Sequence, residues 1–167
     1  MAVSKNCQYI VSGDYGGTIK VWSFEEDFKE IYTITIPQSG WVYCLAINEE
    51  CTAIISGSTD KKIRIWSLQD GKLIRTLEGH KDAVLSVAIS NNGKYLISGG
   101  GYNDRTVKVW DFQTGKEVRT LTGHNGGVWS IAISKNCKFF LSGSDDKTIK
   151  VWSMEDFKEI ATLQDQG

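Results

Sequence analysis

A five-residue pattern that ends in tryptophan occurs four times along this chain, at residues 18–22, 62–66, 106–110 and 148–152. The four tryptophans are Trp22, Trp66, Trp110 and Trp152, and successive ones are 44, 44 and 42 residues apart. A period within about 20 to 50 residues indicates repeated units that bury their faces only by stacking on one another. The pattern therefore predicts one continuous array over all 167 residues.

Each repeat has the composition of four short strands joined by tight turns. In the last repeat we expect strands at residues 128–133, 138–141, 148–152 and 158–163, because these runs are rich in Val, Ile, Leu and Trp and are bounded by turn residues. The chain contains one proline and 17 glycines, which favours paired strands with tight turns. Four antiparallel strands with a period near 42 residues match one blade of a β-propeller.

Further motifs make the chain similar to a known family. Gly79-His80 and Gly123-His124 precede the first strand of the third and fourth repeats, and Trp110-Asp111 is a Trp-Asp pair. The chain resembles the WD-repeat (WD40) β-propellers over essentially its whole length. The resemblance implies an all-β fold of about four blades, at residues 1–36, 37–78, 79–122 and 123–167, of which the first lacks most of its inner strand.

The resemblance also implies a hydrogen-bonded tetrad of His, Ser, Asp and Trp in each complete blade. In the third repeat the tetrad residues are His80, Ser98, Asp104 and Trp110. In the fourth repeat they are His124, Ser142, Asp146 and Trp152. The second repeat has Pro37-Gln38 where Gly-His belongs, and the first has Gly16 where Asp belongs. We therefore expect complete tetrads only in the last two repeats.

The motifs give no support to catalytic chemistry. The two histidines of the chain both occupy tetrad positions, where the imidazole ring is expected to fix a turn. The tetrad aspartates Asp60, Asp104 and Asp146 lie one to a blade in the last three repeats, so they would lie too far apart to act as a carboxylate pair. The sequence contains no nucleotide-binding loop, nucleophile elbow or metal-ligand motif. We predict that the chain is not an enzyme and has no catalytic residue, cofactor or metal.

Charge and cysteine content limit the classes of partner and the cellular compartment that we expect. Lys and Arg number 19 and Asp and Glu number 20, so the net charge of −1 offers no general attraction to nucleic acid or to a membrane, and we expect neither as a partner. Four cysteines at irregular spacing do not suggest a disulfide scaffold, and we expect free thiols. Without an apolar leader or a run long enough to cross a membrane, we expect a cytoplasmic protein.

A basic residue stands two positions before each repeated tryptophan, as Lys20, Arg64, Lys108 and Lys150. A ring of cations that binds phosphate is one interpretation of this recurrence. We favour a structural role, in which the aliphatic stems pack on the blade and the charged heads reach water.

Residues that differ between otherwise similar repeats indicate where a partner binds. In WD-repeat propellers, partners most often bind the face that carries the start of the first strand and the turn before the tetrad Asp. The corresponding residues are Tyr15, Trp41, Tyr43, Thr59, Leu85, Tyr102, Asn103, Trp129 and Asp145. Tyrosine and tryptophan are common anchors of interaction hot spots, so this set predicts a non-catalytic scaffold for a peptide or protein. The alternative for Trp41 and Trp129 is that they only fill space between inner strands.

Four blades are fewer than the seven or eight, roughly, that the resemblance implies for a closed ring. Three assemblies remain open: a homodimer of two half-rings that forms an eight-bladed ring, a piece of a longer array, and a lone four-bladed ring. We favour the homodimer, because an open half-ring exposes two apolar blade faces. The truncated first strand is the argument against it. A purely structural role in building a larger ring is the alternative to partner binding.

Overall fold

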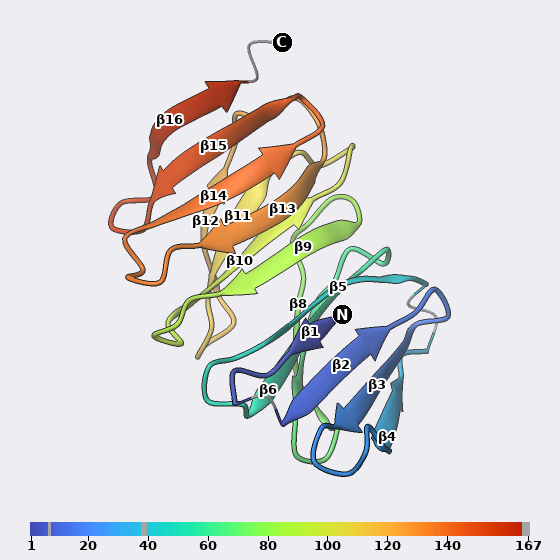
Figure 1. Cartoon of the computed structure of the whole chain (residues 1–167). Coiled ribbons are helices and arrows are strands. Elements are labelled where there is room, and N and C mark those ends of the chain that lie inside the picture. Colours follow the sequence, from blue (N-terminus) through green and yellow to red (C-terminus); the bar gives the residue numbers. More distant parts are fainter. Residues whose placement is uncertain (7, 38–39, 165–167) are drawn as a thin grey trace.

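The computed structural model describes residues 1–6, 8–37 and 40–164 of the chain, so Cys7 and Gln38 lie outside the described residues. The described residues form sixteen strands and no helix (Figure 1). The strands make four sheets, each of four antiparallel strands that are consecutive in the sequence. The expected all-β fold is therefore confirmed, and the sheets are called blades 1 to 4 in chain order.

Blade 1 contains β1 (Ala2–Val3), β2 (Tyr9–Gly13), β3 (Thr18–Ser23) and β4 (Glu30–Thr35). Blade 2 contains β5 (Val42–Ile47), β6 (Ala53–Ser58), β7 (Ile63–Ser67) and β8 (Leu73–Leu77). Blade 3 contains β9 (Val84–Ile89), β10 (Tyr95–Gly100), β11 (Val107–Asp111) and β12 (Glu117–Leu121). Blade 4 contains β13 (Val128–Ile133), β14 (Phe139–Ser144), β15 (Thr148–Ser153) and β16 (Glu159–Gln164).

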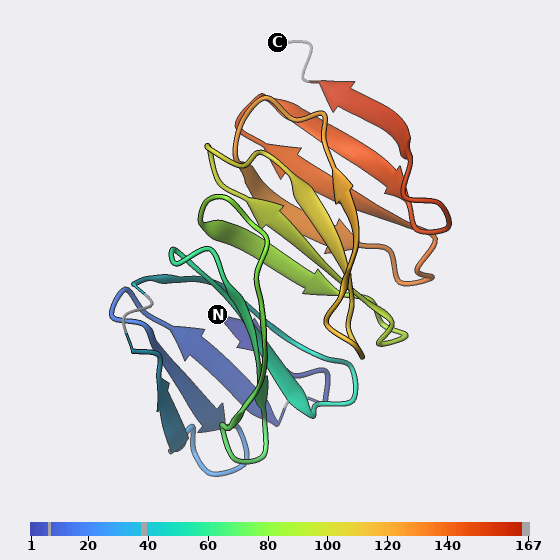
Figure 2. The same cartoon turned by 180° about the vertical axis from the view of Figure 1, so that it is seen from behind.

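The blades stack in an open arc, with the first strand of each blade on the inner side. β5 contacts β1 and β2, β9 contacts β5 and β6, and β13 contacts β9 and β10. Blade 1 and blade 4 lie at opposite ends of the arc in both views (Figures 1 and 2). The chain thus differs from the lone four-bladed ring, because its two end blades do not close on each other.

The hydrophobic core consists of layers between successive blades. One layer joins Val11, Ile19 and Val21 of blade 1 to residues of blade 2 that include Ile54 and Trp66. Two similar layers lie between blades 2 and 3 and between blades 3 and 4. Blades 2 and 3 are covered on both faces, and every residue of β6 is buried, as expected for a strand with apolar layers on both sides. The repeat supplies the same apolar residues to each layer.

The second strand of the last repeat is longer than expected, since β14 continues to Ser144 instead of ending at 141. The Ser-Gly pair therefore lies within the strand, where Ser142 pairs with Lys150 and Gly143 with Ile149. In blades 1 to 3 the corresponding glycines face the first strand of the next blade at close range. The absence of a side chain at this position allows successive blades to approach.

Gly99 and Gly143 provide a matched test of this interpretation. A Cβ atom at Gly99 would lie 2.6 Å from the carbonyl oxygen of Val128, whereas a Cβ at Gly143 would meet nothing nearer than Ser130, at 3.8 Å. We expect Gly99→Ala to lower the free energy of unfolding by about 1–3 kcal/mol, because it overpacks the layer between blades 3 and 4. Gly143→Ala is the control and should change it by less than about 0.5 kcal/mol. Urea denaturation measures both, and equal effects would contradict the close approach of the blades.

Candidate functional site

The tetrad of blade 3 fixes the turn that begins this blade. The Trp110 indole donates to Ser98 Oγ at 2.9 Å, and Ser98 Oγ lies 2.7 Å from His80 Nε2. His80 Nδ1 lies 2.5 Å from the carboxylate of Asp104, which also accepts a hydrogen bond from the Thr106 hydroxyl. Burial raises the pKa of Asp104, but the hydrogen bonds from His80 and Thr106 outweigh it and hold the pKa below its ordinary value. Both ring nitrogens of His80 are therefore engaged by tetrad partners, Ser98 and Asp104.

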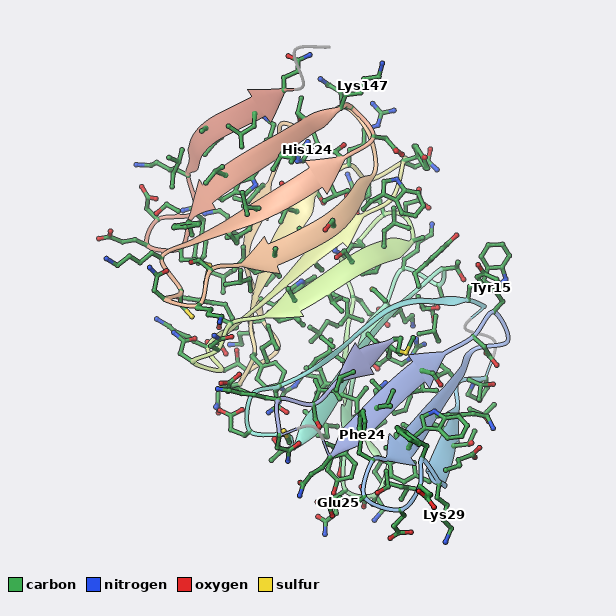
Figure 3. The ribbon with its side chains drawn as sticks, in the orientation of Figure 1. Tyr15, Phe24, Glu25, Lys29, His124 and Lys147 are labelled. Carbon is green, nitrogen blue, oxygen red and sulfur yellow. The ribbon has the colours of Figure 1, made fainter. Side chains whose placement is uncertain are left out.

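Blade 4 repeats this arrangement. Trp152 Nε1 donates to Ser142 Oγ at 2.8 Å, and His124 lies 2.8 Å from both Ser142 Oγ and Asp146 Oδ2. Burial raises the pKa of Asp146, but hydrogen bonds from Thr148, Asn125 and His124 lower it well below its ordinary value. Figure 3 shows His124 close to the ribbon of this blade.

In blade 2 an arginine replaces the histidine as the partner of the tetrad aspartate. Trp66 Nε1 still donates to Ser56 Oγ at 2.9 Å. Arg64 Nη2 donates to Asp60 at 2.6 Å, and both side chains are largely buried. Arg64 Nη1 is buried without a hydrogen-bond partner among the described residues. This ion pair was not predicted from the sequence, although Arg64 is the one arginine among the four recurring basic residues.

Blade 1 has the least complete version of the tetrad. Trp22 Nε1 donates to Ser12 Oγ at 3.0 Å, so the Ser-Trp half is present. The following turn is capped by Asp14, whose Oδ1 accepts from the backbone N–H groups of Gly16 and Thr18 at 2.8 Å. Gly16 stands at the position of the tetrad aspartate, and the Asx-type cap of Asp14 holds the turn in its place.

The recurring lysines have a structural role, but the expectation that their heads reach water was wrong for blades 3 and 4. Lys108 Nζ donates to Glu117 at 2.8 Å and to Thr120, and Lys150 Nζ donates to Glu159 and Thr162 in the same way. Both lysine side chains are about nine-tenths buried. A buried ammonium requires a paired anion, and the fourth strand of the blade supplies it.

Five aromatic side chains form a continuous surface, called here the aromatic rim: Tyr15, Trp41, Tyr43, Tyr102 and Trp129. The rings of Tyr15 and Trp41 lie 4.7 Å apart between centroids, and those of Trp41 and Tyr43 lie 5.9 Å apart. Trp129 then meets Tyr43 at 6.4 Å and Tyr102 at 6.2 Å, in both cases with the rings nearly perpendicular. The rim is therefore a single surface that contains residues of all four blades.

Most of the rim is accessible to solvent. The exposed fractions of Trp41 and Trp129 are 46% and 44%, and that of Tyr15 is 72%. Figure 3 shows Tyr15 projecting from the turn between β2 and β3. Both indoles are therefore about half exposed and are not enclosed between inner strands.

A carboxylate is held within the rim. Trp129 Nε1 donates to Asp145 Oδ2 at 2.6 Å, and a hydrogen bond with Asp145 raises the pKa of Tyr102. Asp145 itself is exposed. The rim thus presents an acceptor between two aromatic rings, and the indole of Trp129 is fixed in orientation.

Three further residues that the sequence predicted to bind a partner, Leu85, Thr59 and Asn103, are not part of the aromatic rim. Leu85 is 8% exposed, so it offers almost no surface to a partner. Thr59 Oγ1 accepts from the backbone N–H of Trp41 at 3.0 Å and so orients that tryptophan. Asn103 is exposed and donates to Asp82 through both its backbone and its side chain.

Asp82 supports the rim, although the sequence did not predict it as a site residue. Its Oδ2 accepts from Asn103 N at 2.9 Å and thereby holds the insertion that carries Tyr102. The hydrogen bonds from Asn103 lower the pKa of Asp82 below its ordinary value. The signal available in the sequence is its place shortly after Gly79-His80, where the fourth repeat has Gly126 instead.

A hollow of about 410 Å³ adjoins the rim between blades 1 and 2. Gly13, Asp14, Tyr15, Val42 and Tyr43 line it. It lies where β1, with only two residues, leaves the end of β2 without a paired strand. The hollow gives the rim a concave border beside Tyr15 and Tyr43.

The described part of the chain was also compared with the requirements of metal sites, disulfides and membrane-spanning helices. Residues 1–6, 8–37 and 40–164 hold no cluster of three or more His, Cys, Asp or Glu side chains able to bind a metal. The described cysteines, Cys44, Cys51 and Cys137, form no disulfide, and burial raises the pKa of the Cys44 thiol to about 12. None of the described residues belongs to a helix of the length and apolarity needed to cross a membrane.

Comparison with known proteins identifies the family. The family model described as "WD domain, G-beta repeat" matches residues 1–23, 28–67, 71–111 and 115–153, which together cover most of the chain. The last three segments each begin before the fourth strand of one blade and end with the third strand of the next, so the sequence repeat is offset from the blade. None of the curated proteins compared with the chain matches it. With four matched repeats and four propeller-type blades, the chain belongs to the WD-repeat family.

Proposed function

We propose that the protein is a non-catalytic scaffold that binds a segment of a partner protein on the aromatic rim. WD repeats commonly mediate protein–protein interaction. The observation that carries the proposal for this face is the unbroken contact of five aromatic rings from four blades. Tyrosine and tryptophan provide large contact areas at a small cost in side-chain entropy, which suits them to anchor a partner.

The polar groups of the rim support an extended peptide as the bound segment. Asp145 offers an exposed acceptor between Trp129 and Tyr102, and the hollow beside Tyr15 offers room for a side chain. Aromatic side chains that combine a large apolar area with fixed polar groups are typical of protein-interaction surfaces. The proposal includes no catalytic residue, cofactor, nucleic acid or membrane, and it places the protein in the cytoplasm.

Loss of partner binding on substitution of the rim tests this function. We expect Trp129→Ala and Tyr43→Ala each to weaken binding at least about tenfold, since hot-spot side chains contribute about 2 kcal/mol or more. The measurement compares proteins retained by immobilised wild-type chain with those retained by each variant, followed by titration of the retained partner. Ile160→Ala, a change to an exposed apolar residue on β16, is the control. Unchanged retention by folded rim variants would refute the proposal.

For the assembly we propose that a second copy of the chain completes the ring. Ring completion does not involve the rim, so the two proposals stand or fall separately. The alternative function, in which the chain is only a structural part of a larger ring, predicts that the rim variants behave like wild type in every binding measurement.

A further inference from the structure

One part of the aromatic rim combines exposed rings with a carboxylate. Tyr102 and Trp129 are 53% and 44% exposed, and the ring of Tyr43 lies at 90° to that of Trp129. In a perpendicular pair one ring contacts the other through its edge, so its own faces are not covered by that neighbour. We call this part of the rim, which consists of Tyr43, Tyr102, Trp129 and Asp145, the Asp145 site.

The carboxylate of Asp145 is a feature of blade 4 alone. The same turn position in the other three blades is occupied by uncharged residues: Tyr15, Thr59 and Asn103. The turn between the second and third strands therefore forms without a carboxylate at this position. Asp145 is exposed, and its side chain is held by the indole N–H of Trp129 at 2.6 Å and by a hydrogen bond with Tyr102.

No cation of the described residues is paired with this carboxylate. In blade 4, Lys150 forms a salt bridge with Glu159 at 2.9 Å. None of the described residues forms one with Asp145, including Lys147, which lies two positions further along the same turn. A carboxylate has two oxygens with about four lone-pair sites, so the hydrogen bonds from Trp129 and Tyr102 leave room for further donors.

The rings of the site also have no cation over them. Elsewhere in the chain such contacts do occur, and Lys108 Nζ lies 5.9 Å from the centre of the Trp110 ring. In the described part of the chain, no lysine or arginine has this position over a ring of the Asp145 site. Arg105 lies close in the sequence, but its Nε donates to the backbone carbonyl oxygen of Tyr102 at 2.7 Å. Exposed aromatic faces beside a carboxylate are complementary to a cation supplied from outside.

We infer that the Asp145 site binds an arginine side chain of the partner segment, with the guanidinium over an exposed ring and its N–H groups donating to Asp145. Arginine fits better than lysine because its planar guanidinium stacks on an aromatic face and donates hydrogen bonds in its own plane at the same time. An ammonium group is a compact point charge without such a face. The inference rests on the proposed function and names the side chain that the rim selects.

Three short peptides test the chemistry of the bound side chain. They are acetylated chains of glycine and alanine that differ only at a central arginine, citrulline or lysine. The readout is the NMR resonance of the Trp129 indole N–H, which is assigned by its loss in Trp129→Ala. We expect the arginine peptide to shift this resonance. Citrulline has a similar shape but no charge, so it should bind about tenfold more weakly, because it loses both the cation–π contact and the ion pair. The lysine peptide should bind about twofold more weakly or less well still.

Asp145→Asn tests the carboxylate separately from the rings. Asparagine keeps an oxygen that accepts from the Trp129 indole and removes only the charge. The arginine peptide should bind this variant about threefold more weakly, whereas the citrulline peptide should bind it as well as the wild type. Glu155→Gln is the matched control, since it removes an exposed carboxylate of the same blade at the opposite end of β15 and should leave both affinities unchanged. Circular dichroism checks that both variants keep the wild-type strand content.

Each outcome supports or overturns the inference. It is overturned if the arginine peptide leaves the Trp129 resonance unshifted, if citrulline binds as tightly as arginine, or if Asp145→Asn binds the arginine peptide like the wild type. A lysine peptide that binds as tightly as the arginine peptide overturns the assignment to a guanidinium.

The retention of partner proteins by immobilised chain separates this inference from the proposed function. If Trp129→Ala loses the retained partner and Asp145→Asn keeps it at full affinity, the rim binds its partner without an arginine, and only the inference fails. If folded Trp129→Ala and Tyr43→Ala both keep the partner, the proposed function itself fails, whatever the peptides do.

Discussion

Replacing Trp110 with alanine is expected to lower the free energy of unfolding by about 3–5 kcal/mol, the usual cost of deleting a buried aromatic side chain. Trp110 is 2% exposed and packs in the layer between blades 2 and 3, with Ile63 and Leu77 among its neighbours. Its indole also donates to Ser98, so the change removes both a large buried volume and one arm of the tetrad. Domains of this size have a total free energy of unfolding of about 5–15 kcal/mol, so the substitution removes a large share of the stability.

Trp129→Ala is the control for this experiment because it deletes the same side chain from the rim. Trp129 is 44% exposed and belongs to none of the hydrophobic layers, so we expect a loss of less than about 1 kcal/mol. Urea denaturation followed by circular dichroism gives both values under the same conditions. Similar losses for the two tryptophans would show that the rim, and not only the blade layers, carries the stability of the arc.

Replacing Asp104 with asparagine is expected to lower the free energy of unfolding at pH 7 by about 1.5–3 kcal/mol, the contribution of a hydrogen bond to a charged group. Asp104 is almost completely buried and accepts hydrogen bonds from His80, Thr106 and the backbone of Lys81. Asparagine retains the size of the side chain but carries no charge and replaces one acceptor oxygen with a donor. The substitution therefore isolates the electrostatic part of the tetrad.

The pH dependence of stability gives a second readout for Asp104. Its pKa in the folded chain is below the ordinary value, so the ionised form stabilises the fold at pH values above about 3.9, the pKa in an unfolded chain. This contribution is lost as the pH falls from there through the folded pKa. Asp104→Asn should therefore show a shallower decline in stability below about pH 4 than the wild type.

Glu155→Gln provides the control for the pH series. Glu155 is an exposed carboxylate in the turn after β15, so its removal should leave the acid limb of the stability curve unchanged. Stability is measured by urea denaturation from pH 3 to pH 7. An Asp104→Asn curve that runs parallel to the wild-type curve would mean that the ionised carboxylate contributes nothing specific to the fold.

The tetrads illustrate how far repeated sequence determines local structure. The tetrad residues that the family resemblance implied for blades 3 and 4 lie within hydrogen-bond distance of one another in the structure. The resemblance succeeds here because all four residues belong to one blade, where strand pairing and turn length fix their relative positions. The Arg64–Asp60 pair was missed because an arginine and a lysine at the same strand position reach different partners.

The aromatic rim illustrates the limit of the same reasoning. The sequence placed each ring at the rim end of a strand or in a neighbouring turn, but it gave no reason to expect Tyr43 of blade 2 to meet Trp129 of blade 4. That contact depends on how sharply the blades curve, which is a property of three stacked layers. Leu85 of blade 3 is buried, although the sequence predicted a partner-binding residue at this position.

By itself, the sequence determined the family, the four blades and the residues within each blade, because these follow from period, strand alternation and turn chemistry along one continuous stretch of chain. Only the tertiary structure decided that blades 1 and 4 lie at opposite ends of an open arc and that five rings from four blades form one surface. The physical reason is that these features arise from packing between blades, and packing depends on three-dimensional shape that no single repeat encodes.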